Sequence, residues 1–294
     1  MAERSTEARH PGSAGLHIAS GAEALTRLLD AQAAALEAVR PAIPALERVA
    51  DAAANALRAG GKLAYVGAGS SGLMALSDCL ELAGTFGSAP DRTPVLCAGG
   101  AAALLHMTGA VEDDPALARA DFAAAGLRAG DMALCLSASG GTPYTLEVAA
   151  LARAAGVTVA GIANVAGSAL LRAADLPVLL ETGPEIVTGS TRMGAATAQK
   201  AALNMLSALV GIRLGHVHDG YMVNVVADNA KLRDRAARIV CALSGADMDS
   251  SRAALETTGG AVKPAVLVAR GRTAAGAAED LASSRGHLAH WLDG

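Results

Sequence analysis

The stretch that decides the fold is KLAYVGAGSSG, residues 62–72, in which a short apolar run leads into a turn rich in glycine and serine. Gly67–Gly72 matches the pattern G-x-G-x-x-G, the phosphate-binding turn of dinucleotide-binding folds. In those folds an acidic residue at the end of the second strand binds the ribose hydroxyls. The second apolar run here, Val95–Ala98, ends in glycines, and Asp91 precedes it, at the wrong end. A nicotinamide dinucleotide is therefore disfavoured.

A second turn of the same kind, SASGGT at residues 137–142, follows the apolar run Met132–Leu136. Loops that follow parallel strands meet at the carboxyl edge of the sheet, where ligands of open α/β folds bind. Backbone N–H groups at the start of the helix after Gly72 attract an anion, and hydroxyl groups add donors. Glycine and serine also form turns without any ligand, so either turn alone is weak evidence. Together they favour a small sugar phosphate, bound by Gly69, Ser70, Ser71, Ser137, Ser139 and Thr142.

Outward from these turns, apolar runs alternate with helix-length segments. Each run is nearly continuous in apolar residues, which is typical of strands covered on both faces in a parallel sheet. The runs are Leu63–Val66, Val95–Ala98, Met132–Leu136, Val157–Ala163 and Leu176–Leu180. The helical segments are Gly72–Ala83, Asp114–Ala125, Pro143–Ala155, Ser168–Ala173 and Ala195–Leu214. The alternation predicts an α/β fold with a doubly wound, mostly parallel sheet.

The chain divides into three predicted parts. Residues 1–20 are polar and form an arm, either mobile or ordered on a partner subunit or substrate. Residues 21–232 form the sugar-phosphate-binding domain, which begins with a helical pattern broken at Pro41 or Pro44. Residues 233–294 form a small helical subdomain. Its three helical patterns are Arg235–Leu243, Ser250–Thr257 and Ala274–Leu292, with an apolar stretch at Pro264–Ala269.

Composition narrows the class of function. The formal charge is −4 with no basic block, which disfavours nucleic acid and anionic membranes as partners. No apolar run approaches the roughly 18 residues of a membrane span, and the first residues lack the apolar core of a secretory signal. Four single cysteines, Cys79, Cys97, Cys135 and Cys241, predict small buried thiols in a reducing cytosol.

The histidines do not predict a metal site. His216 and His218 form an H-x-H pair, but no third ligand lies nearby in the sequence. We therefore expect no metal, and we expect His106 to be structural or next to the substrate.

Two glutamates are candidates for acid–base chemistry. Glu81 lies between Leu80 and Leu82, on the helix that Gly72 opens. Its apolar neighbours would raise its pKa if they desolvated it, as suits a general acid, but it could equally lie on a solvated helix face. Glu112 precedes a helix that starts at Pro115, where it could be catalytic or could merely support the helix cap. The residues alone leave both roles open.

These residues resemble the N-acetylmuramic acid 6-phosphate etherases, members of the sugar isomerase (SIS) fold group, over most of the chain. The order and spacing of the matching segments hold throughout. The segments are Thr6-Glu7, GAGSSG at 67–72, Glu81 within DCLELAGTFG, HMTGAVED at 106–113, SASGGTPY at 137–144, EIVTGSTRM at 185–193, TAQKAALNMLS at 197–207 and MVNVVADNAKL at 222–232.

The resemblance implies a specific reaction without metal or organic cofactor. The family cleaves the D-lactyl ether of N-acetylmuramic acid 6-phosphate and releases N-acetylglucosamine 6-phosphate and D-lactate. By motif match, Glu81 corresponds to the general acid and Glu112 to the general base, and Ser190 joins the expected substrate-binding residues. The resemblance also implies a homodimer, because sites of this fold are commonly completed by a partner subunit, and a role in the cytoplasmic recycling of cell-wall amino sugars.

The chain departs from the family pattern at four positions. Leu73 and Gly141 stand where the family has arginine, Gly194 where it has lysine, and His10 where it has asparagine. Lost cations could weaken the hold on a phosphate or carboxylate. Two other functions therefore stay open: an aldose–ketose isomerase that acts on a phosphosugar, and a non-catalytic regulator that binds one.

Overall fold

The computed structural model describes residues 5–106 and 108–292. Its centre is a five-stranded sheet in the order β2-β1-β3-β4-β5, with every neighbouring pair parallel. The strands are β1 (Leu63–Gly67), β2 (Val95–Cys97), β3 (Met132–Ser137), β4 (Thr158–Ala163) and β5 (Leu176–Leu179). All residues of β1 and β3 are buried, because helices cover both faces of the sheet. The predicted fold class is confirmed.

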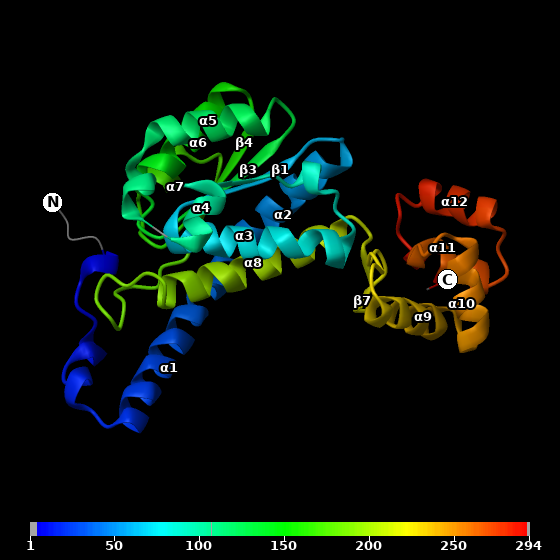
Figure 1. The fold of residues 1–294 in the computed structure, drawn as a ribbon, viewed down its shortest axis with the longest axis horizontal. Helices are drawn as coiled ribbons and strands as arrows, with labels where there is room; N and C mark the ends of the chain where they lie inside the picture. The colour runs from blue at the N-terminus through cyan, green and yellow to red at the C-terminus, as the bar shows by residue number, and fades with distance from the viewer. Residues whose placement is uncertain (1–4, 107, 293–294) are drawn as a thin grey trace. The chain divides into compact units, whose positions relative to one another are not determined.

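The helices form two layers around this sheet (Figure 1). On one side lie α5 (Pro115–Ala125), α6 (Pro143–Ala154) and α7 (Ala169–Ala173). On the other lie α2 (Ile43–Arg58), α3 (Gly69–Phe86) and α8 (Gly194–Arg213). A short helix that the sequence did not predict, α4 (Gly100–Leu105), follows β2. None of the described helices is long and apolar enough to cross a lipid bilayer.

The chain forms two compact units. Within the described residues, one unit comprises those up to residue 79 together with 91–207, and the other comprises 80–90 together with those from residue 208 on. Two of the three boundaries therefore fall inside helices, α3 and α8. The C-terminal region is helical, as predicted. The boundary between residues 232 and 233 stays a prediction.

Besides the last parts of α3 and α8, the described part of the second unit contains five helices, which pack around the C-terminal core. They are α9 (Ala230–Ser244), α10 (Met248–Thr257), α11 (Val262–Ala269), α12 (Ala274–Ser283) and α13 (Ala289–Leu292). Two expectations were wrong here. The apolar stretch at Pro264–Ala269 is helix α11, which admits Pro264 because the first turn of a helix needs no N–H donors. The single helix expected over Ala274–Leu292 is broken, since Arg285 and Gly286 have φ of 53° and 81°.

A small hairpin in this unit was not predicted. Strands β6 (Val217–His218) and β7 (Tyr221–Met222) pair antiparallel. Asp219 and Gly220 connect them with φ of 46° and 75°. Two positive φ angles in a two-residue Asp-Gly turn are typical of a type I′ hairpin, whose twist matches that of the strands. The signal was present in the sequence as the dipeptide Asp-Gly.

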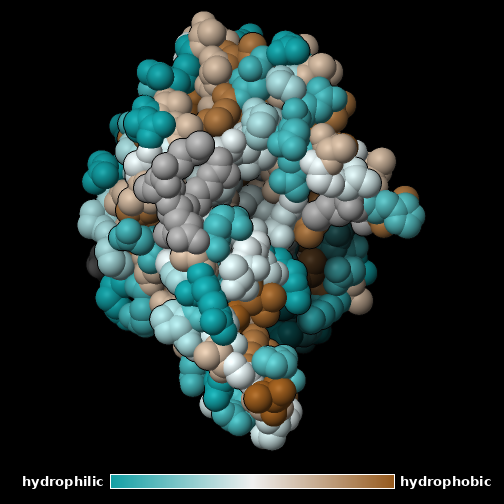
Figure 2. Space-filling view, turned by 90° about the vertical axis from the view of Figure 1, so that its left-hand side faces the viewer, coloured by the Kyte–Doolittle hydropathy of each residue, from teal (hydrophilic) through white to brown (hydrophobic). Residues whose placement is uncertain are grey.

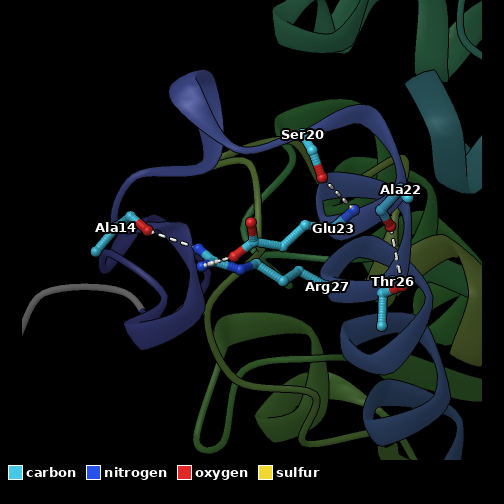
Figure 3. A network of polar contacts seen from close by, with 6 residues as sticks. All are labelled: Ala14, Ser20, Ala22, Glu23, Thr26 and Arg27. Carbon is cyan, nitrogen blue, oxygen red and sulfur yellow. Dashed lines mark hydrogen bonds and ion pairs between the residues drawn. The ribbon is translucent and has the colours of Figure 1, made fainter.

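The described part of the N-terminal arm folds onto its own chain. It contains three short 3-10 turns, Ser5–Glu7, Pro11–Ser13 and Leu16–Ile18, before α1 (Gly21–Glu37). Figure 3 shows how α1 begins: Ser20 Oγ accepts from the Glu23 backbone N–H at 3.2 Å, and Arg27 donates to the carbonyl of Ala14 at 2.8 Å while also contacting Glu23. The break predicted at Pro41 or Pro44 is confirmed, because α1 ends at Glu37 and α2 begins at Ile43.

Candidate active site

The two hydroxyl-rich turns leave neighbouring strands at the same edge of the sheet. β1 and β3 pair in parallel, with Gly67 opposite Leu136. The first turn follows β1 and the second follows β3, so both lie at the carboxyl edge, where open α/β sheets bind ligands.

The first turn is a close crossing of backbone segments. A Cβ on Gly67 would lie 2.9 Å from the Gly72 backbone, and a Cβ on Gly72 would lie 2.9 Å from Cys97 Sγ. Gly69 starts α3 with φ of +52°, which glycine adopts at little cost. Ser70 is half-buried and Ser71 buried in the first turn of α3. Their position at a helix N-terminus is favourable for an anion.

Glu112 lies directly against this turn. It belongs to the 3-10 segment Gly109–Asp113, and a Cβ on Gly69 would come within 2.5 Å of its Oε1. Partial burial, reinforced by the neighbouring Asp113 carboxylate, raises the pKa of Glu112. A carboxylate with a raised pKa at the mouth of a phosphate-type turn is suited to proton abstraction near neutral pH. The cap of helix α5 is provided by Asp114, whose side chain accepts from the backbone N–H groups of Ala116 and Leu117.

The second turn forms its own network of hydroxyl groups. The buried Ser137 shares a hydrogen bond of 2.8 Å with Thr142, and its Oγ lies 3.5 Å from that of Ser139. Ser139 Oγ accepts from the Gly141 N–H at 3.2 Å. Gly140 has φ of +61°, and a Cβ there would lie 2.2 Å from Ser168 Oγ, so the turn is packed tightly against α7. The hydroxyls are held in place and together present donors from one loop.

Cys97, Asp121 and Tyr144 were not proposed as site residues from the sequence. Cys97 ends β2, and Cys97 and Asp121 both line a cavity of about 370 Å³. The pKa of the Cys97 thiol is raised by burial, then by Asp121 and Glu112. Tyr144 is fully buried and donates to Asp121 at 2.5 Å. Cys97 could have been found from its place at the carboxyl end of a strand, whereas the Tyr144–Asp121 pair joins two helices and has no sequence signal.

The N-terminus of α8 is occupied by a side chain of this chain. Glu185 is buried, and its carboxylate accepts from the backbone N–H groups of Gly194 and Ala195 at 2.8 Å each. A Cβ on Gly194 would lie 3.1 Å from Glu185 Oε2, so the small residue at this position lets the carboxylate reach the helix end. Glu185 therefore satisfies the positive end of the α8 dipole, a role the sequence analysis missed.

Ser190 lies just before this helix end, in the loop that the arm covers. It is half-buried, and its backbone bonds to Val187 and Met193. Ser13 Oγ donates to the Ile186 carbonyl at 2.7 Å, and a Cβ on Gly189 would lie 3.1 Å from a Glu7 carboxylate oxygen. The arm thus packs on the loop that holds Ser190.

Glu81 lies on α3 and is exposed to solvent in the single chain, between exposed Leu80 and buried Leu82. Of the two environments left open by the sequence, the solvated helix face is the one found. One turn earlier, buried Asp78 accepts from Tyr65 at 3.0 Å and from Ser207 at 3.1 Å, and Lys200 Nζ lies 4.0 Å away. This buried polar cluster anchors the first part of α3 to β1 and α8.

The described residues contain no group of three His, Cys, Asp or Glu side chains that could hold a metal ion. His216 is largely buried, which together with nearby Lys263 and His287 lowers its pKa to about 4.

All four cysteines are free: Cys79 and Cys135 are buried as expected, while Cys97 and Cys241 are only half-buried.

Comparison with known proteins first defines the class. The SIS domain family model matches residues 27–164. The fold is also that of a phosphoheptose isomerase from Francisella tularensis, with a TM-score of 0.51 and 19% identity over 66% of this chain and 100% of that one. The parallel sheet with loops converging at one edge is therefore an SIS domain.

Whole-chain relatives then give the family. An N-acetylmuramic acid 6-phosphate etherase from Deinococcus radiodurans is 44% identical, covering 97% of this chain and 93% of the relative. The N-acetylmuramic acid 6-phosphate etherase of Pectobacterium atrosepticum is 41% identical over a match that covers 90% of this chain and 87% of that relative. The chain belongs to the N-acetylmuramic acid 6-phosphate etherase family.

Proposed function

We propose that this protein cleaves the D-lactyl ether of N-acetylmuramic acid 6-phosphate, giving N-acetylglucosamine 6-phosphate and D-lactate. In the ring-opened sugar the C2 proton is acidic because it lies next to the aldehyde, and the lactyl oxygen on C3 is placed for elimination. A base removes the C2 proton, the C3–O bond breaks as an acid protonates the ether oxygen, and D-lactate leaves. Water then adds across the C2–C3 double bond. Proton transfer suffices for this sequence.

The observation that carries the proposal is the contact between Glu112 and the first turn. We assign the C2 proton to Glu112, since its raised pKa makes it a stronger base than an unperturbed glutamate while it is ionised. Its carboxylate is adjacent to Gly69, at the start of the helix that would face the substrate anion. A substrate held by the turn would thus lie within reach of the base.

We assign the role of general acid to Glu81. This assignment rests on the family motif. Its solvent exposure in the single chain is consistent with a site completed by a second subunit. Cover from a partner would exclude water from this carboxyl and enclose it with the substrate.

The phosphate is proposed to bind to neutral donors. Ser70, Ser71, Ser137, Ser139 and Thr142 supply hydroxyl groups from two turns, and backbone N–H groups of α3 add to them. Ser190 would contribute from its own loop. Because Leu73 and Gly141 replace family arginines, recognition depends on hydrogen bonds and the helix dipole more than on cations.

We propose that the protein is a homodimer, supported by an apolar stripe on α1. Leu25, Leu29 and Leu36 are 69%, 67% and 45% exposed, and their spacing places them on one helix face. In Figure 2, hydrophobic side chains lie on the part of the protein that projects downward. Figure 1 shows that the arm and α1 form this part. A second copy would cover such a stripe.

The free cysteines support a reducing, cytoplasmic location.

The proposal is tested by incubating the purified protein with N-acetylmuramic acid 6-phosphate and measuring D-lactate. Release of D-lactate with N-acetylglucosamine 6-phosphate is the expected result. An isomerase would convert a phosphosugar without releasing lactate, and a regulator would bind it without turnover. Absence of lactate at high enzyme concentration would therefore exclude the etherase activity.

A further inference from the structure

The last turn of α3 is bonded by the segment that follows the small hairpin. The final carbonyls of a helix have no partner within the helix. Here Asn224 Nδ2 donates to the Phe86 carbonyl at 2.7 Å, and the Val226 backbone N–H donates to the Gly84 carbonyl at 3.3 Å. Asn224 and Val226 belong to MVNVVADNAKL, a segment for which the reaction itself provides no role.

Close packing shows how tightly this end is held. Gly87 has φ of +65°, and a Cβ on it would lie 2.6 Å from Asn224 Nδ2 and 2.8 Å from the Asn224 carbonyl oxygen. On α8, a Cβ on Gly211 would lie 2.8 Å from the ring of Phe86. Both glycines therefore permit an approach that any larger residue would prevent.

Glu81 depends on this helix end for its position. It lies three residues before Gly84 and five before Phe86 on the same helix. Its side chain is exposed, and no hydrogen bond or ion pair fixes it within the described part of the chain. The backbone of α3, whose final turn is bonded by Asn224, therefore sets the position from which this side chain reaches out.

We propose that Asn224 is a positioning residue for Glu81. By holding the Phe86 carbonyl, it keeps the last two turns of α3 in the register that aims Glu81. This inference rests on the proposed function only for the role of Glu81 as general acid. The bond between Asn224 and the helix end stands independently of that role.

The test uses two variants that disturb the contact from opposite sides. Asn224→Leu keeps the branched shape of the side chain but removes the donor, and Gly87→Ala pushes on Asn224 through its new Cβ. In both we expect kcat to fall about tenfold with KM within about twofold of the wild type, because misaiming a catalytic group costs turnover rather than substrate binding. Hydrogen exchange in the peptide covering residues 80–88 should become about tenfold faster.

Asn229→Ala is the matched control. Asn229 lies in the same segment and accepts from the Leu232 N–H at 3.0 Å, capping α9. Its loss should lower Tm but leave both kcat and exchange at residues 80–88 unchanged. This comparison separates a general loss of stability from a loss of positioning.

Each outcome decides a different point. If residues 80–88 exchange no faster in Asn224→Leu than in Asn229→Ala, Asn224 does not hold the helix end and the inference is wrong. If exchange rises while kcat stays at the wild-type value, the helix end is held but does not position the acid. If the wild type releases no D-lactate, the proposed function fails instead, and exchange alone still decides whether Asn224 anchors α3.

Discussion

Glu112 is the residue whose chemistry depends most on tertiary contacts. Its carboxylate touches the Gly69 backbone, although the two residues are far apart in the chain. We expect Glu112→Gln to lower kcat by about a hundredfold or more, because the amide cannot accept the C2 proton, with little change in KM. Steady-state D-lactate release measures both constants. A variant that retains more than half of the wild-type kcat would rule out Glu112 as the base.

The raised pKa of Glu112 also predicts a pH dependence. The base must be ionised, so kcat/KM should fall as pH drops through a pKa above that of an unperturbed glutamate. The folded state binds this proton more tightly than the unfolded chain, so the contribution of Glu112 to stability is present at low pH and is lost as pH rises through its folded pKa. A pH–rate profile of the wild type, beside urea unfolding at several pH values, checks both signs. An acid limb at the ordinary glutamate pKa would contradict the prediction.

A variant at Gly69 tests whether its approach to Glu112 matters for turnover, apart from the strain of a left-handed backbone. Gly69→Ala carries a left-handed φ of +52° and places a Cβ 2.5 Å from Glu112 Oε1. Gly126→Ala is the control, with φ of +57° and its nearest neighbouring atom, Lys62 Nζ, 4.0 Å away. Both should lose about 1 kcal/mol of stability, but only Gly69→Ala should also lose activity, by about tenfold. Equal activity in the two variants would show that the Gly69–Glu112 contact does not matter for turnover.

At the scale of elements, the N-terminus of α8 offers a test of helix capping. Glu185→Ala removes a buried carboxylate that accepts two backbone N–H groups at 2.8 Å. We expect a loss of about 2–3 kcal/mol, since buried hydrogen bonds to a charged group are among the stronger ones. Asp247→Ala, which uncaps α10 at an exposed position, should cost clearly less. Urea unfolding of both variants decides; equal losses would mean that burial adds nothing to the α8 cap.

The elements themselves were largely predictable. The five strands and the helices α2, α3, α5, α6, α7 and α8 follow the alternation of apolar runs and helical patterns closely. The errors lie where local signals conflict. The apolar stretch Pro264–Ala269 was not among the predicted helical patterns, yet it is helical, because Pro264 is tolerated in a first turn. The break after α12 depends on positive φ angles at Arg285 and Gly286, of which the sequence showed only the glycine.

At the scale of the whole molecule, the apolar stripe on α1 predicts the assembly. The double variant Leu25→Glu with Leu29→Glu should shift the protein from dimer to monomer without unfolding it, because charges cannot be buried in an apolar contact. Ala34→Glu, exposed on the same helix and away from the stripe, is the control. Sedimentation and circular dichroism measure the two properties. A double variant that stays dimeric, or a wild type that is monomeric, would contradict the proposed use of this surface.

The sequence by itself determined the class of fold and the family. Continuous apolar runs, turns rich in glycine and serine, and the order of motifs are local properties, so they survive in a one-dimensional description. It also pointed to Glu81 and Glu112, without separating catalysis from helix capping or a solvated helix face.

Only the tertiary structure decided which side chains meet. The contacts of Glu112 with Gly69, of Tyr144 with Asp121, of Glu185 with α8 and of Asn224 with the end of α3 join segments distant in the chain. Burial follows from the same packing, and so does the pKa of Glu112, since desolvation depends on everything that surrounds a group and not on its neighbours in sequence. The order of the motifs thus identifies the family, and the folded chain shows that the Glu112 carboxylate lies against the turn at residues 67–72.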